Sequence, residues 1–149
     1  MERTPQTLVV DASAAAKWVI EEKDSEKALA LRDAHLQGRI NLTAPDLIVY
    51  EFTNALIYNP KISTSEVIAK VQDLLELELD LVPPSREYST QIARTARKYS
   101  ISSYDASYVA LSSLIVTRLI TADRKLREKL PTNANVLLVE DLGRKWSLP

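Results

Sequence analysis

The sequence predicts an α/β fold in which helices cover both faces of a mostly parallel β-sheet. Short apolar runs alternate with longer segments of helical periodicity along the chain, an order that is typical of parallel sheets. The runs at residues 8–10 and 136–139 are almost continuously apolar, as strands buried on both faces should be. The 149 residues suit one domain with its own core. We therefore expect a single domain over residues 1–149, with residues 1–6 and 143–149 as peripheral tails.

Glycine, proline and capping residues set the expected boundaries in the first half of the chain. Gly38 should end the second helix, and Asp46 is placed to cap the third, which Pro60 stops. Ser63 and Glu66 have the spacing of a capping box, which opens a fourth helix. The expected elements are a strand at 7–10, helices at 12–19 and 25–37, a strand at 40–44, and helices at 47–58 and 64–78.

The second half continues the alternation. A pair of prolines at positions 83 and 84 ends an apolar run and separates it from the next helix. The expected elements are a strand at 79–82, helices at 87–99 and 104–114, a strand at 118–121, a helix at 123–130 and a last strand at 135–139.

Composition excludes several classes of protein. The chain has no cysteine and a single histidine, His35, so disulfides and Cys/His zinc sites are ruled out. No apolar run approaches the ~18 residues of a membrane span, and residues 1–6 do not resemble a secretory signal. We expect a cytoplasmic protein with no membrane association. The net charge of −1 does not by itself indicate nucleic-acid binding.

Two acidic residues follow predicted strands. Asp11 closes the apolar run at residues 8–10, and Asp123 follows the run at 119–122. Ligand sites of parallel α/β sheets gather beyond the carboxyl ends of the strands, so both acids should lie at the same edge of the sheet. Ser13 and Thr121 each stand two residues from one of these acids and can offer supporting hydroxyl groups.

Two further acids lie on predicted helices. Glu51 interrupts an apolar helix, and Asn54, one turn later, is placed to orient it. Asp105 falls in the first turn of its helix, where the macrodipole favours negative charge. Grouped carboxylates repel one another unless a cation joins them, and oxygen ligands of this kind suit Mg²⁺ or Mn²⁺. A metal-activated water would need no histidine base, which points to phosphodiester chemistry.

Each acid also has a purely structural explanation. Asp11 and Asp123 could serve only as helix N-caps, Asp105 could be a favourable first-turn charge, and Glu51 could belong to a solvated stripe. The residues alone leave these alternatives open, and the case for a site rests on the four acids taken together.

Four segments, in this order, resemble the PIN domain and, within it, the VapC-type toxins of toxin–antitoxin pairs. The matching segments are residues 9–18, 45–56, 104–111 and 119–123, and the likeness spans about residues 7–142. The resemblance implies a three-layer α/β/α sandwich. It also implies that Mg²⁺ or Mn²⁺ is held by four acids supported by Ser13 and Thr121. The implied catalytic and metal-binding residues are Asp11, Glu51, Asp105 and Asp123.

The resemblance further implies an endoribonuclease that cleaves RNA with a metal-activated water. It suggests a homodimer and a cognate antitoxin protein that blocks the site. Three basic residues lie close to the acids in sequence and are candidates to hold phosphates, namely Lys17, Arg124 and Lys125.

Two other functions remain to be weighed. A metal-dependent phosphatase or phosphotransferase of the haloacid dehalogenase type also has an aspartate after its first strand, but it requires a second aspartate where this chain has Ser13. A catalytically silent PIN-fold binding module would be expected to lack one of the four acids. A nucleotide-binding Rossmann enzyme is disfavoured because only Gly38 and Gly143 are present and no glycine-rich phosphate loop can form.

Overall fold

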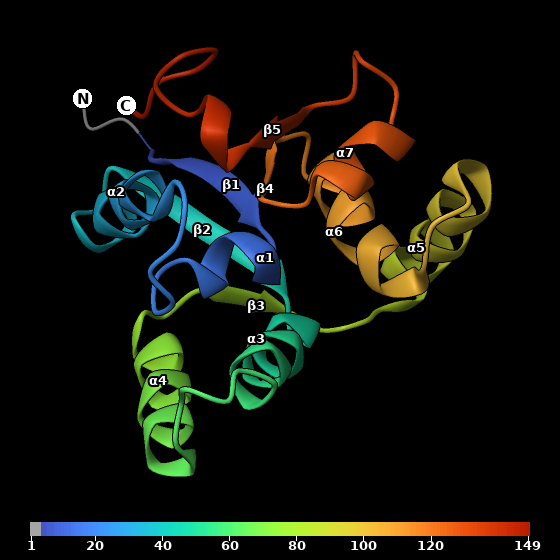
Figure 1. Ribbon diagram of the computed structural model, residues 1–149. Coiled ribbons are helices and arrows are strands. Elements are labelled where there is room, and N and C mark those ends of the chain that lie inside the picture. Colours follow the sequence, from blue (N-terminus) through green and yellow to red (C-terminus); the bar gives the residue numbers. More distant parts are fainter. Residues whose placement is uncertain (1–3) are drawn as a thin grey trace.

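A computed structural model of the protein describes residues 4–149. Residues 1–3 of the expected N-terminal tail lie outside the described residues. A five-stranded, all-parallel sheet forms the centre of the fold (Figure 1). The strands are β1 (Gln6–Val10), β2 (Ile40–Pro45), β3 (Asp80–Val82), β4 (Leu119–Thr121) and β5 (Val136–Leu138). The prediction of an α/β fold with a parallel sheet is confirmed.

The sheet order is β3-β2-β1-β4-β5, so β1 is the central strand. Its neighbours β2 and β4 run parallel to it on either side, and Val10 pairs with Ile120. The last three residues of β1 are fully buried, as the continuous apolar run predicts. Because Val10 and Ile120 are opposite one another, the residues that follow them, Asp11 and Thr121, meet at the carboxyl edge.

Helices cover both faces of the sheet, and in Figure 1 those from the first half of the chain gather on one side of the view. The helices of the described residues are α1 (Ala12–Ala16), α2 (Ser25–Leu36), α3 (Leu47–Ile57), α4 (Thr64–Glu76), α5 (Arg86–Tyr99), α6 (Ser103–Leu114) and α7 (Arg124–Lys129), followed by the 3₁₀ turn η1 (Val139–Asp141). Helix α6 packs against β1, β2 and β4, and its residues 106–112 are all buried.

Most predicted boundaries fall within two or three residues of the observed ones. Gly38 ends α2 with a φ of 72°, which glycine adopts without strain, and the Ser63 hydroxyl accepts a hydrogen bond from the Glu66 amide at 3.2 Å. Two predictions differ from the structure. Asp46 precedes α3 but makes no capping bond with its side chain, because its own backbone is already helical. Gln6, expected in the tail, belongs to β1.

Both the histidine and the C-terminal segment are more involved in the fold than their sequence suggests. The Leu42 amide donates to His35 Nδ1 at 3.1 Å, so the other ring nitrogen, Nε2, carries the proton and donates to the Leu77 carbonyl at 2.7 Å. His35 thus joins α2, β2 and the end of α4. Trp146, in the peripheral segment 143–149, packs against the core, and the Arg118 guanidinium lies 5.3 Å from its ring centre. None of the helices in residues 4–149 has the length and apolar character needed to cross a membrane.

Candidate functional site

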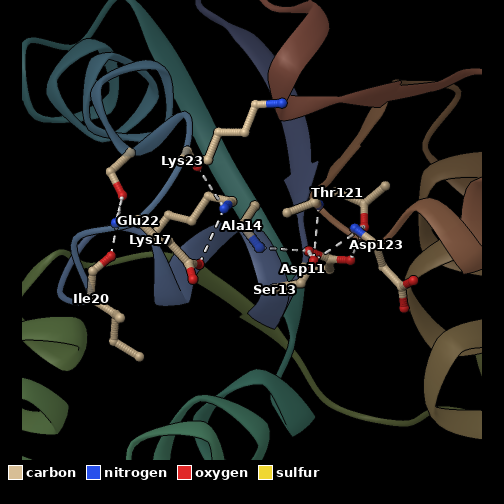
Figure 2. Close-up of polar contacts among 11 residues, drawn as sticks. Asp11, Ser13, Ala14, Lys17, Ile20, Glu22, Lys23, Thr121 and Asp123 are labelled. Carbon is tan, nitrogen blue, oxygen red and sulfur yellow. Dashed lines mark hydrogen bonds and ion pairs between the residues drawn. The ribbon is translucent and has the colours of Figure 1, made fainter. Parts of the chain in front are cut away.

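Asp11 is the most buried of the four candidate acids, with 5% of its surface exposed. It stands between β1 and α1 and caps that helix, because Oδ1 accepts from the Ala14 amide at 3.0 Å. Oδ1 also accepts from the Ser13 hydroxyl at 2.7 Å, and the Thr121 hydroxyl donates to Oδ2. Figure 2 shows these groups converging on the carboxylate. A carboxylate with three donors is held in one orientation.

Burial raises the pKa of Asp11 to about 6, although the three hydrogen bonds oppose the rise. The negative charge of Asp123 adds to it. Without a positive partner, this carboxylate is therefore costly to keep ionised in the folded protein. Capping alone does not explain why an acid, rather than a neutral cap, stands here.

The hydroxyl groups of Ser13 and Thr121 tie the end of β1 to the end of β4. Their oxygens lie 3.3 Å apart. The Ala122 amide donates to Ser13 Oγ at 2.9 Å, and the Asp123 amide donates to Thr121 Oγ1 at 3.0 Å. The structure thus brings both predicted supporting hydroxyls to Asp11 and fixes the backbone that carries Asp123.

Asp123 occupies the N-cap position of α7 and accepts from the Leu126 amide at 3.1 Å. Its carboxylate extends beyond the Asp11 cluster in Figure 2. Its charge acts on two of the other acids, since it raises the pKa of Asp11 and of Asp105. Asp123 therefore lies between the strand ends and the start of α6.

Asp105 lies in the first turn of α6, as predicted, and its amide donates to the Ser102 hydroxyl at 3.1 Å. Burial raises the pKa of the Asp105 carboxyl, and the charge of Asp123 raises it further. Lys129 on α7 opposes this rise, but it does not cancel it. Asp105 is half-buried, so its side chain can be reached from solvent.

Glu51 lies on α3 and is also half-buried. Burial raises the pKa of its carboxyl, and the charge of Asp105 adds to the rise. Glu51 and Asn54 both line an open groove along α3. Asn54 was expected to orient Glu51, but the described residues show no hydrogen bond between the two side chains. The partner that the structure gives to Glu51 is Tyr108, whose hydroxyl donates to Oε1 at 2.6 Å.

Tyr108 was not singled out from the sequence, because an aromatic residue in an apolar helical stretch looks like ordinary core. Only 2% of its surface is exposed. Burial and the hydrogen bond to Glu51 raise the pKa of Tyr108 far above its usual range. The phenol therefore keeps its proton and acts as a donor. The signal that identifies Tyr108 is a buried hydroxyl next to Glu51, an acid that the apolar helix does not explain.

The four acids are electrostatic neighbours, because the charge of Asp123 acts on the pKa of Asp11 and of Asp105, and the charge of Asp105 acts on the pKa of Glu51. All four stand near one edge of the sheet, yet among residues 4–149 no three acidic or histidine side chains lie close enough together to enclose one ion. The acids supply the oxygen donors that Mg²⁺ and Mn²⁺ prefer. Three of them have pKa values raised in the absence of a cation. The chemistry of the donor set therefore fits a divalent metal.

The basic candidates divide into two groups. Lys17 and Arg124 line one cavity of about 130 Å³ together with Lys23, whereas Lys125 is exposed outside that cavity. The Lys17 ammonium donates to the Lys23 carbonyl at 2.8 Å. Arg124 forms an ion pair with Glu140, so this pair must open before the guanidinium can bind a phosphate.

The chain is similar to known proteins over most of its length. Residues 8–129 match the family model of the PIN domain. The chain is 35% identical over 129 residues to Ribonuclease VapC3 of Pyrobaculum aerophilum, a match that covers 83% of this chain and 95% of that protein.

Two solved structures share the fold. The crystal structure of PAE2754 from Pyrobaculum aerophilum has a TM-score of 0.67 and 22% identity, covering 91% of this chain and 85% of that one. VapBC-5 from Mycobacterium tuberculosis, a member of the VapBC family of toxin-antitoxin systems, has a TM-score of 0.57 and 14% identity, covering 90% of this chain and 98% of that one. At these identities the structures support the fold alone.

Proposed function

The chain belongs to the PIN domain family, and we propose that it is a metal-dependent endoribonuclease of the VapC type. One observation carries the proposal: four acids interrupt apolar elements along one edge of the sheet, where the charge of Asp123 raises the pKa of Asp11 and of Asp105, and the charge of Asp105 raises the pKa of Glu51. The identity with Ribonuclease VapC3, over nearly the whole of that protein, supports RNA as the substrate. Because its proposed substrate is RNA, we infer that the protein acts in the cytoplasm. We also infer that it acts as a single domain.

Asp11, Glu51, Asp105 and Asp123 would hold Mg²⁺ or Mn²⁺. When bound, such an ion polarises the phosphate and lowers the pKa of an attacking water. The residues of the chain prepare this chemistry. Asp11 is held in place by its three donors, and Ser13 and Thr121 keep it beside the backbone of Asp123.

Phosphate binding is the proposed role of the basic residues. Lys17 and Arg124, with Lys23, give the cavity beside Ala122 three positive side chains against the carboxylates of Asp24 and Glu140. A phosphate next to the scissile one would be attracted there. Lys125 remains a candidate for a more distant backbone contact.

A homodimer and an antitoxin are the proposed partners. The identity with Ribonuclease VapC3, together with the fold shared with VapBC-5 from a family of toxin-antitoxin systems, supports the proposal that this chain is the toxin of such a pair. Helices α3 and α4 carry large exposed apolar side chains, which are candidates for a subunit contact. These side chains are Tyr50, Ile57, Tyr58, Ile68 and Leu75. A monomeric mass by light scattering at micromolar concentration would count against the dimer.

The direct test is to incubate the purified chain, free of antitoxin, with a panel of single-stranded and structured RNAs. We expect cleavage with Mg²⁺ or Mn²⁺ and none with EDTA. Asp11→Asn should be inactive, whereas Asp33→Asn, which removes a surface acid paired with Arg32, should retain activity. Absence of cleavage on every RNA, together with no metal binding by calorimetry, would favour a silent binding module. Trapping of beryllofluoride on Asp11 would favour a phosphatase.

A further inference from the structure

A single hydrogen bond crosses from α6 to α3 within the acidic site. The hydroxyl of Tyr108 donates to Glu51 Oε1 at 2.6 Å, although the two residues are 57 positions apart. Tyr108 is 2% exposed, whereas Glu51 is half-buried. The donor is therefore fixed by the core and the acceptor is a side chain with three rotatable bonds at its edge.

Tyr108 lies close to three of the four candidate acids. Besides burial, the charges of Glu51 and Asp11 raise the pKa of Tyr108, so the phenol lies near both carboxylates. It lies three residues after Asp105, hence on the same face of α6. One uncharged group thus stands among the segments that carry Asp11, Glu51 and Asp105.

The two ends of the site differ in how their acids are held. Asp11 accepts three hydrogen bonds from neighbouring groups, whereas Tyr108 is the side chain that holds Glu51. Glu51 also lines an open groove of about 710 Å³ with Asn54 and Tyr104. Because that groove is open to solvent, loss of the phenol would leave the carboxylate free to turn outward.

We propose that Tyr108 is the positioning residue of the acidic site and holds Glu51 in the orientation in which it can join the other acids around a divalent cation. This inference rests on the proposed metal-dependent function. The inference gives Tyr108 a role that the other buried tyrosine, Tyr88, does not have. The hydroxyl of Tyr88 donates to the Ser107 carbonyl at 2.5 Å. Tyr88 fastens α5 to α6 and contacts no candidate acid.

The test compares Tyr108→Phe with Tyr88→Phe, because each removes one buried phenol hydroxyl and leaves the ring. Mn²⁺ binding to the full chain is measured by calorimetry. Loss of a group that orients a metal ligand typically weakens metal affinity about 10–100-fold, and we expect Tyr108→Phe to fall in this range. Tyr88→Phe should bind Mn²⁺ as the wild type does, even if its melting temperature falls as much. RNA cleavage by Tyr108→Phe should lose kcat with KM unchanged.

The Glu51→Gln background shows whether Tyr108 acts through Glu51. There, adding Tyr108→Phe should cause no further loss of Mn²⁺ affinity, because the carboxylate that the phenol positions is already gone. Wild-type affinity in folded Tyr108→Phe would overturn the inference while leaving the proposed function standing. Equal losses in Tyr108→Phe and Tyr88→Phe would also overturn it. A wild type that binds no Mn²⁺ and cleaves no RNA would instead overturn the proposed function and the inference with it.

Discussion

The acidic site has a strand half and a helix half, and the two are built differently. The strand half consists of Asp11, Ser13, Thr121 and Asp123 at the ends of β1 and β4, joined by short hydrogen bonds between side chains and backbone. The helix half consists of Glu51 on α3, and of Asp105 and Tyr108 on α6. Its two acids are half-buried, and Glu51 opens onto a groove.

This difference teaches where rigidity in the site comes from. Parallel strands fix the relative positions of the residues that follow them, so Asp11 and Thr121 are set by the register of the sheet. Helices leave more freedom, because α3 and α6 are joined at the site by the side-chain contact of Tyr108 with Glu51. Changes in the strand half should therefore alter stability and activity together, whereas changes in the helix half should act mainly on activity.

The largest effect is expected for Asp11→Asn, which removes the most buried charge of the strand half. Hydrolysis of RNA should be abolished, since the proposed metal ligand, an oriented carboxylate, is lost. The metal-free variant should nevertheless melt at a higher temperature than the wild type, because the cost of burying the Asp11 charge disappears, and with it the smaller repulsion from Asp123. Activity assays and thermal melts in EDTA check both parts; a fully active variant would contradict the role of Asp11.

The pH dependence of the free energy of unfolding should also reveal the charge of Asp11. The pKa of Asp11 in the folded protein is about 6, above its ordinary value of 3.8, so the folded state holds the proton more tightly than the unfolded state. Stability of the metal-free protein should therefore fall as pH rises from 4 to 6 and then level off. Asp11 alone would contribute a decrease of up to about 3 kcal/mol.

Urea unfolding at a series of pH values, in EDTA, measures this slope. Asp11→Asn should reduce it, and Asp33→Asn should leave it as in the wild type. An identical slope in Asp11→Asn would contradict the raised pKa of Asp11.

A moderate effect is expected for Thr121→Val. Thr121 is fully buried, and its hydroxyl both donates to Asp11 and accepts from the Asp123 amide. Leaving these groups without a partner should cost about 1–3 kcal/mol of stability and reduce RNA cleavage about 10–100-fold. Tyr108→Phe should lose comparable activity but less stability, because Glu51 can turn to solvent. If both variants lose equal stability, the contrast between the two halves fails.

The smallest effect is expected outside both halves, at Val116. Its φ is 52°, a left-handed conformation that is unfavourable for a β-branched residue, and 88% of its surface is exposed. Val116→Asn should stabilise the protein by about 0.5–1 kcal/mol without changing RNA cleavage. A loss of activity in this variant would show that the site is sensitive to changes far from either half.

Local sequence patterns predicted most of the fold and the strand half of the site. Apolar runs located the strands, and the rule that parallel strands end at a common edge brought Asp11 and Asp123 together. The same reasoning missed contacts that depend on packing between distant segments. Tyr108 contacts Glu51, 57 positions away, and His35 contacts Leu77, 42 positions away. Neither contact leaves a periodic pattern in the sequence. Asp46 resembled a cap, but its backbone is already helical and leaves no capping bond to make.

The most direct test of the account is the position of Mn²⁺ in a crystal soaked with the metal and measured by anomalous diffraction. We expect a peak at the carboxyl edge of the sheet, with oxygens of Asp11 and at least one other of the four acids within about 2.0–2.3 Å. Glu51 should still accept the hydrogen bond from Tyr108. A peak at a surface carboxylate such as Asp33, with none beside Asp11, would contradict this expectation.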